Sequence, residues 1–298
     1  MLFGSFLGDS HSLGVHWVYN TRAIDKKVGR VEELIAPIVN RFHPNRGKGE
    51  FTHYGDQSYF LLEYLSNHNE FLQEEFLSAW ADYMRSYDGY MDHATEDTLK
   101  NIDKGEQGSK AASLSHDLGG AARTAPLIYR YAPDKEKTVQ VCREQTEATH
   151  NNRNVVDSSS FFAEMTLSIL EGGDVEEGLE AAVTTLPDQS ELRELAAAGA
   201  ESKGADSRET ITHFGQACPV EKLFPGTIHL LVTYQDDLQE ALIQNAGAGG
   251  DSATRGLIVG MVLGAYHGYD ALPQSWLEDL AAGEKILTLA EKIDKISG

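Results

Sequence analysis

Apolar residues recur at helical spacing along most of the chain, and short polar or glycine-rich segments separate the runs. The first run carries Leu2, Phe6, Leu13 and Trp17, and Asp9 interrupts it. Since no stretch alternates apolar and polar residues over a convincing strand length, the pattern predicts an all-α fold. We expect a single compact orthogonal multi-helix domain over residues 1–298, with helices in these segments: 2–18, 57–65, a segment after Asn69, 92–102, 134–150, 155–170, two within 174–203, a segment from Asp236, 256–267 and 284–296.

A few boundaries rest on single residues. Asp174 and Asp188 are the expected N-caps of the two helices within 174–203. Pro126 is expected to kink or end the small-residue helix that opens before it. Residues 214–224 look irregular, and the type of the apolar segment 229–234 stays open.

A glycine-rich turn, residues 245–250, leads into Asp251 and then into another helical run. Asp251 stands where an N-cap belongs, and Ser252 and Thr254 can help to cap the same amides. A helix N-terminus with oxygen ligands beside it can bind an anion, a sugar diol or a hard metal ion. The alternative is a helix start whose cap is an aspartate and nothing more.

Three acids share such surroundings. Asp9, Asp56 and Asp251 each stand at or beside a helix end among apolar and glycine residues. A buried charge needs a partner, so three such acids in one helical domain favour a common site. Mg²⁺ prefers oxygen ligands, which carboxylates and threonine hydroxyls at converging helix starts can supply.

Composition narrows the classes of function. The 298 residues include 46 acidic and 25 basic ones, for a net charge of −21. This balance argues against nucleic acid or an anionic membrane as a partner bound through a basic face. The two cysteines, Cys142 and Cys218, show neither a metal-type spacing nor a disulfide framework. With no signal peptide or membrane-spanning run visible, we expect a soluble, cytoplasmic protein.

Four segments together resemble the ADP-ribosylglycohydrolase family, all-helical enzymes that break down ADP-ribose linkages with Mg²⁺ or Mn²⁺. The segments are 4–14 with Gly8-Asp9, 52–57, 119–126 with Arg123, and 249–268. Their order and spacing span nearly the whole chain. The chain is also similar to the branch that includes the jellyfish J-type crystallins.

The chain departs from the family pattern at two acids. Gly55 stands where the motif Thr-Asp-Asp-Thr has its first acid, and Ala253 replaces the second acid of Gly-Gly-Asp-Thr-Asp-Thr. A metal-binding Glu shortly after Gly8-Asp9 also lacks a counterpart. Two adjacent divalent ions would lose most of their charge compensation. We therefore expect at most one Mg²⁺, or none, held by Asp56, Asp251 and Thr254.

The resemblance also implies roles for the remaining residues. Asp56, His53 and Asp9 are the candidate catalytic groups, since neutral imidazole can act as a base near pH 7. We expect substrate to be bound by the following residues: Gly119, Gly120, Arg123, His150, Gly249, Gly250 and Ser252. For a histidine taken alone, a structural or surface role is more common than a catalytic one.

Three functions follow from these observations. The first is hydrolysis of a ribosyl glycosidic bond in an ADP-ribose-linked or related nucleotide substrate. The second is binding of such a ligand without catalysis, the missing acids having been lost with turnover. The third is a crystallin-like structural protein. The remaining acids Asp9, Asp56 and Asp251 favour the first two.

Overall fold

The computed structural model describes residues 1–297, and in these residues helices and connecting segments form the whole fold without a β-strand. The predicted all-α, compact multi-helix fold is confirmed. That one domain spans residues 1–298 stays a prediction. The helices are α1 Leu2–Leu13, α2 Thr21–Lys27, α3 His53–Asn67, α4 Gln73–Arg85, α5 His93–Asp103, η1 Gly108–Lys110, α6 Gly119–Ala122, α7 Ala125–Tyr131, α8 Lys135–Glu147, α9 Arg153–Leu170, α10 Val175–Thr185, α11 Glu191–Glu201, α12 Ser207–Phe214, α13 Val220–Thr233, α14 Leu238–Gly247, α15 Ser252–His267, η2 Tyr269–Ala271, α16 Gln274–Asp279 and α17 Gly283–Ser297.

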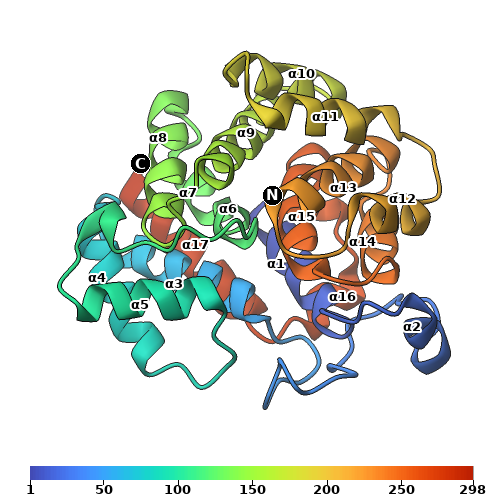
Figure 1. Ribbon diagram of the computed structural model, residues 1–298, viewed down its shortest axis with the longest axis horizontal. Helices are drawn as coiled ribbons and strands as arrows, with labels where there is room; N and C mark the ends of the chain where they lie inside the picture. Colours follow the sequence, from blue (N-terminus) through green and yellow to red (C-terminus); the bar gives the residue numbers. More distant parts are fainter. Residues whose placement is uncertain (298) are drawn as a thin grey trace.

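The first helix and one of the last, α1 and α15, pack together near the middle of the molecule (Figure 1). Gly4 faces Gly260, and Gly8 faces Gly256, so closely that a Cβ on any of them would collide with the opposite backbone. The glycines spaced four apart in α15 therefore serve close helix packing, as predicted. This contact places Asp9 of α1 near the start of α15.

Several helices differ from the sequence-based expectation. The first ends at Leu13 rather than at residue 18, α15 begins at Ser252 rather than at residue 256, and α2, α12 and α16 were not predicted. The small-residue helix α6 ends at Ala122, ahead of Pro126, and Pro126 lies in the first turn of the next helix, α7, where its missing N–H costs nothing. Residues 215–219 are irregular, as expected for the segment 214–224. Residues from Val220 on, together with the apolar segment 229–234 up to Thr233, form α13, which continues through Pro225. The start of α11 is capped by Ser190 rather than Asp188, because the Ser190 hydroxyl accepts from the Leu192 N–H.

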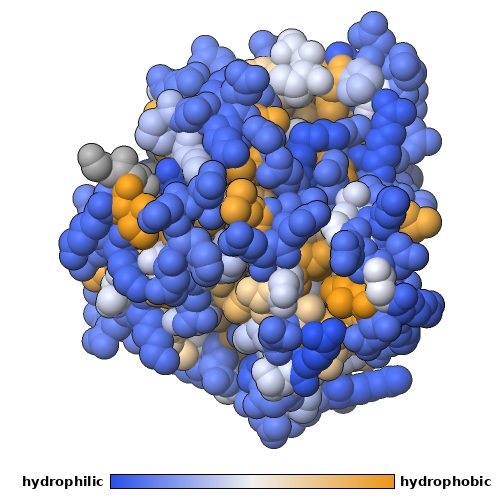
Figure 2. Space-filling view, turned by 90° about the vertical axis from the view of Figure 1, so that its left-hand side faces the viewer, coloured by the Kyte–Doolittle hydropathy of each residue, from blue (hydrophilic) through white to orange (hydrophobic). Residues whose placement is uncertain are grey.

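The face of the molecule in Figure 2 is mostly hydrophilic, as the acidic composition suggests, with apolar groups in small scattered areas. The buried apolar side chains form one large cluster, and a small second cluster lies around Val15 and Ile24. In residues 1–297, the helices lack the combination of length and apolar character that a bilayer crossing needs.

Candidate functional site

The turn before α15 holds Asp251 in a fixed orientation. Gly249 and Gly250 have φ values of 68° and 65°, a left-handed region that suits glycine. Asp251 is fully buried and caps α15, accepting from the N–H of Thr254 at 3.1 Å and from its hydroxyl at 2.8 Å. His16 Nε2 lies 3.1 Å from the same carboxylate. The N-cap predicted for Asp251 is confirmed.

Asp117 and Cys218 lie beside Asp251. One carboxylate oxygen of each aspartate and the Cys218 sulfur all lie within 4.8 Å of one another, and we call this group the DCD cluster. The hydroxyl of Tyr54 donates to Asp117 at 2.9 Å, and the N–H of Gly119 donates to it at 2.7 Å. The cluster therefore combines a loop before α6, a loop before α13 and the start of α15.

The three acidic groups of the DCD cluster affect one another's ionisation. Burial and then the neighbouring Asp251 raise the pKa of Asp117 well above its usual range. Burial and the two carboxylates likewise raise the pKa of the Cys218 thiol. Burial opposes ionisation of Asp251, but the bonds from His16 and Thr254 outweigh it and lower its pKa. Asp251 therefore holds the negative charge, and Asp117 and Cys218 hold protons.

Asp9 forms a different contact. Its carboxylate is fully buried and accepts from the Thr52 N–H at 2.8 Å and from the Thr52 hydroxyl at 2.6 Å. Burial raises the pKa of Asp9 to about 7, against the lowering effect of these bonds. A Cβ on Gly55 would collide with this carboxylate, so the glycine is what allows Asp9 to approach α3.

Asp56, in the first turn of α3, has its counterion inside the protein. Its Oδ2 accepts from the Arg46 guanidinium at 2.8 Å and from the Tyr87 hydroxyl at 2.6 Å. Burial raises the pKa of Asp56, and Arg46 acts against that rise. Asp56 lines a cavity of about 240 Å³ together with Arg46, Tyr59 and Lys285.

His53 lies between these two regions. Its Nε2 is 3.2 Å from Oδ2 of Asp92, which caps α5, and the ring is 2% exposed. The His16 and His53 ring centroids are 6.1 Å apart. On the far side of His16, its Nδ1 lies 3.1 Å from Nε2 of His43. Burial lowers the pKa of His16 and that of His43, so both rings are neutral.

The predicted substrate-binding residues around α6 are closely packed. Gly119 and Gly120 leave room for the Tyr54 and His150 rings, which a Cβ would meet. Arg123 is 2% exposed and donates to Gln57 and to the Thr149 hydroxyl, so its guanidinium lies within the core. Burial lowers the pKa of His150 to about 3. Its Nε2 lacks a hydrogen-bond partner among the described residues.

Trp17 has an unusual backbone and a half-buried ring. Its φ of 59° lies in the left-handed region, which a bulky residue rarely adopts and which often marks a functional site. The ring stacks on His16 at 4.4 Å and meets Phe42 and Tyr90 edge to face at 4.8 Å and 5.1 Å. These half-buried aromatic rings border the histidines and offer a surface on which a planar base could stack.

The predicted site residues thus fall into two regions that meet around His53. Asp9 and Asp56 belong to the α3 side, and Asp251 with Thr254, Gly249 and Gly250 belongs to the α15 side. Ser252 also lies there, with a buried hydroxyl that lacks a hydrogen-bond partner in residues 1–297. The roles assigned to these residues stay predictions.

The sequence-based site lacked several side chains that the structure places there. They are Asp117, Cys218, Asp92, Tyr54 and His16. Asp117 stands two residues before Gly119, just ahead of the segment 119–126 that carried the resemblance, and that position was the available signal. Cys218 gave none, because its partners come from distant segments.

Two of the ligands predicted for Mg²⁺ form hydrogen bonds within the protein. Asp56 is already bound by Arg46 and Tyr87, and the Thr254 hydroxyl donates its proton to Asp251. Among residues 1–297, the group of three metal-ligating side chains within 4.8 Å contains Asp251 but not Asp56.

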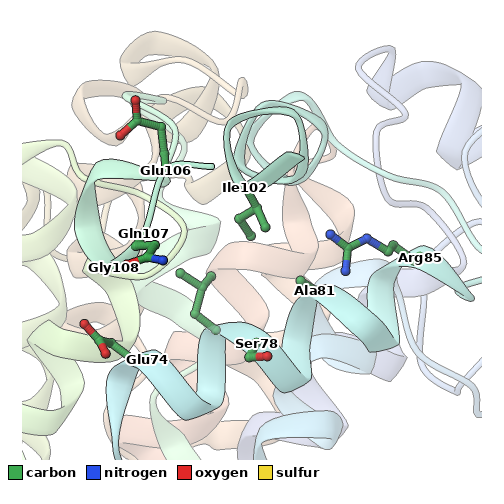
Figure 3. A pocket seen from close by; sticks show the side chains of 9 residues that line it. Glu74, Ser78, Ala81, Arg85, Ile102, Glu106, Gln107 and Gly108 are labelled. Atoms are coloured by element: carbon green, nitrogen blue, oxygen red, sulfur yellow. The ribbon is translucent and has the colours of Figure 1, made fainter. Parts of the chain in front are cut away.

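A separate surface cavity of about 320 Å³ lies between α4 and the α5–η1 segment (Figure 3). Glu74, Ser78 and Arg85 line it, with Ile102 on the opposite side (Figure 3). It contains none of the predicted site residues.

A sequence profile of the ADP-ribosylglycohydrolase family matches residues 1–297. The chain belongs to this family. The solved structure described as "ADP-ribosylglycohydrolase-related protein complex" has a TM-score of 0.78 and 21% identity, covering 100% of this chain and 96% of the other. That likeness confirms the fold.

Two further relatives have names that describe a role. Crystallin J1A of Tripedalia cystophora is 23% identical, over 99% of this chain and 95% of the relative. The ADP-ribosylhydrolase ARH3 of Mus musculus is also 23% identical, but over 61% of this chain and 57% of the relative. The chain is thus similar to proteins named as an enzyme and as crystallins.

Proposed function

We propose that this protein hydrolyses a ribosyl glycosidic bond in an ADP-ribose-linked or related nucleotide substrate. The family match over residues 1–297 supports this class of reaction. The observation that carries the proposal is the pair of His53 and Asp92, 3.2 Å apart, in a buried centre beside Asp56. The ring can take a proton from water, and Asp92 stabilises the imidazolium that results.

The carboxylates on the α3 side have complementary roles in this proposal. Hydrolysis of a glycosidic bond builds positive charge on the sugar ring, which a nearby carboxylate stabilises. Asp56 has this role, and it lines a cavity of about 240 Å³. Asp9 holds Thr52, the N-cap of α3, and so positions both His53 and Asp56.

Substrate contacts come from both regions. The adenine ring stacks on the half-buried aromatic side chains of Trp17 and Tyr90. The backbone at Gly119 and Gly120 approaches the ligand, and so does the backbone of the loop that contains Gly249 and Gly250. Arg123 and His150 support that surface from the core side.

The proposal also covers a bound metal ion and the location of the protein in the cell. At most one Mg²⁺, or none, is expected, and when bound it would supply Lewis-acid stabilisation of negative oxygen. No step above depends on it. A cytoplasmic location stays a prediction.

The direct test is release of free ADP-ribose from ADP-ribosylated protein, followed by chromatography with and without Mg²⁺. We expect release by the unmodified protein and a loss of about 10²–10⁴-fold in kcat for His53→Gln, the range for a lost acid–base group. His213→Gln, an exposed histidine of α12, is the matched control and should leave the rate unchanged. A His53→Gln protein that releases ADP-ribose at the full rate would remove His53 from this role.

Two alternatives rest on specific observations. The acids absent at Gly55 and Ala253 favour a binder without turnover, and the similarity to Crystallin J1A over 99% of the chain favours a structural role. Calorimetric titration with ADP-ribose separates them. Heat without product selects the binder, and neither heat nor product selects the structural protein.

A further inference from the structure

We propose that exposed basic side chains of α2 and of the loop after it form a docking surface for a short acidic polypeptide segment. We call this set of side chains, Arg22, Lys26, Lys27 and Arg41, the basic flank. The inference rests on the proposed function, since it describes the polypeptide that carries the ADP-ribose as acidic around the modified residue.

Charge is distributed unevenly along the chain. Residues 21–48 contain seven of the 25 basic residues but only three of the 46 acidic ones, so this segment is positive in a protein whose net charge is −21. α2 and the loop after it lie along the lower edge of the molecule (Figure 1). Because salt screens exposed charges beyond about 8 Å at physiological ionic strength, an approaching group responds to this local charge more than to the total.

The basic flank is not neutralised by its own neighbours. Two of the three acidic residues in the segment have other partners, since Asp25 pairs with Arg208 at 2.7 Å and Glu32 pairs with Arg30 at 3.1 Å. Among residues 1–297, the four side chains of the basic flank form no ion pair with an acidic side chain. Their charges are therefore available to an anionic partner.

The basic flank adjoins the aromatic rings of the candidate site. The Lys27 ammonium donates to the Ile38 carbonyl at 3.3 Å, which joins α2 to the loop. The Arg41 guanidinium lies 5.1 Å from the centre of the Phe42 ring, and Phe42 meets Trp17 edge to face at 4.8 Å. A polypeptide whose modified side chain reaches these rings has the basic flank beside it.

The spacing of the charges fits an extended peptide. Arg22 and Lys26 are four residues apart in α2, so they share a face and are separated by about 6 Å along the helix. Alternate side chains of an extended peptide point the same way and lie about 6.6 Å apart. A long polyanion such as RNA would also extend over the acidic remainder of the surface, so the charge distribution favours a short acidic peptide.

The binding experiment uses the full-length protein and a fluorescent peptide, Glu-Gly-Glu-Gly-Glu-Gly, that carries no ADP-ribose. Fluorescence anisotropy should show binding that weakens at least about tenfold when the salt concentration rises from about 0.05 M to about 0.5 M. The same peptide with Gln in place of Glu should bind at least about tenfold more weakly at low salt, because each exposed ion pair contributes up to roughly fivefold in affinity. Equal affinity for the two peptides would overturn the proposal, and so would tighter binding of a single-stranded RNA of matching length.

Charge reversal locates the surface. Arg22→Glu combined with Lys26→Glu should weaken binding of the acidic peptide at least about tenfold, because two ion pairs are lost and repulsion is added. Lys100→Glu combined with Lys104→Glu at α5 is the matched control, with the same spacing and the same change in charge, and it should keep the affinity. Equal losses in the two double variants would trace the binding to net charge and overturn the proposal.

Turnover separates this inference from the proposed function. Both peptides are extended by the same ADP-ribosylated residue, and kcat/KM is measured for each. The ratio of kcat/KM for the acidic peptide to that for the neutral one should fall at least about tenfold when Arg22 and Lys26 are reversed. Binding of the acidic peptide without release of ADP-ribose from either peptide would support the docking surface and remove the hydrolase. Release from both peptides with equal kcat/KM would support the hydrolase and overturn the docking surface.

Discussion

Asp56 and Asp251 both stand at the start of a helix, but their charges are balanced in different ways. Asp56 is paired with Arg46 at 2.8 Å and is bonded to Tyr87. Asp251 has a neutral histidine and a threonine as partners, and Asp117 and Cys218 add two more groups that ionise to anions. The comparison teaches that the α3 side balances its carboxylate with an internal cation, whereas the α15 side holds Asp251 with neutral groups beside two further acids.

Restoring the missing acid on the α3 side should have the largest effect. Gly55→Asp would drive a Cβ into the Asp9 carboxylate and add a second charge beside it. Overpacking and an unpaired buried charge together should lower the free energy of unfolding by at least about 4 kcal/mol. Urea unfolding measures the change.

Gly47→Ala is the control for that variant, because a Cβ on Gly47 meets no closer atom than the Glu50 carboxylate at 3.5 Å. It should change stability by less than about 0.5 kcal/mol. A Gly55→Asp protein as stable as Gly47→Ala would show that the α3 side has room for another acid.

The pH dependence of stability tests whether Asp9 is charged. Its pKa in the folded protein is about 7, against about 3.9 when unfolded. The folded state therefore binds the extra proton between these values, and stability falls as the pH rises from about 4 to about 7. Asp9→Asn should flatten this fall by about 2–4 kcal/mol, compared in urea titrations at pH 4.5 and 7.5. Parallel curves for the two proteins would contradict the prediction.

Removing the counterion of Asp56 should make the α3 side more like the α15 side. Arg46→Met leaves a mostly buried carboxylate with Tyr87 as its remaining partner, at a cost of about 1–3 kcal/mol. The same variant should bind Mg²⁺ more tightly than the unmodified protein, measured by calorimetry. Lys48→Met removes an exposed ion pair to Asp279 and serves as the control. Unchanged Mg²⁺ affinity would mean that Arg46 is not what excludes the ion.

The smallest effect is expected at Tyr87. Tyr87→Phe removes the hydrogen bond to Asp56 and the weaker one that Arg46 donates to the Tyr87 hydroxyl, while the bond from Arg46 to Asp56 stays, so the loss should be about 0.5–1.5 kcal/mol. Thermal unfolding of the single variants and of the double variant with Arg46→Met gives the coupling between the two partners. Purely additive changes would show that they stabilise Asp56 independently.

The fold was predictable because each helix carries its own local signal. Asp92, Asp174 and Asp251 cap helices as their positions before apolar runs indicate. The differences at Pro126 and Pro225 have one cause. A proline is compatible with a helix when its missing N–H lies in the first turn or when tertiary packing outweighs the lost bond.

The site was less predictable because its contacts join distant segments. Asp56 was recognised as an acid at a helix start, but its partner Arg46 lies in a loop whose path the sequence does not specify. Cys218 meets Asp117 and Asp251 although about 100 and 33 residues separate it from them along the chain. The local sequence pattern predicts a helix cap, whereas a cluster of side chains from distant segments depends on how the helices pack.

The glycine contact between α1 and α15 has a consequence for the order of folding. The two helices are roughly 240 residues apart, so closing the loop between them costs about 5 kcal/mol of chain entropy before the contact forms. During synthesis, α1 emerges first and must wait for α15 with its glycine face uncovered. Asp9 and His16 therefore approach α15 in one late step, and slow pairing of the two ends would delay completion of both the fold and the candidate site.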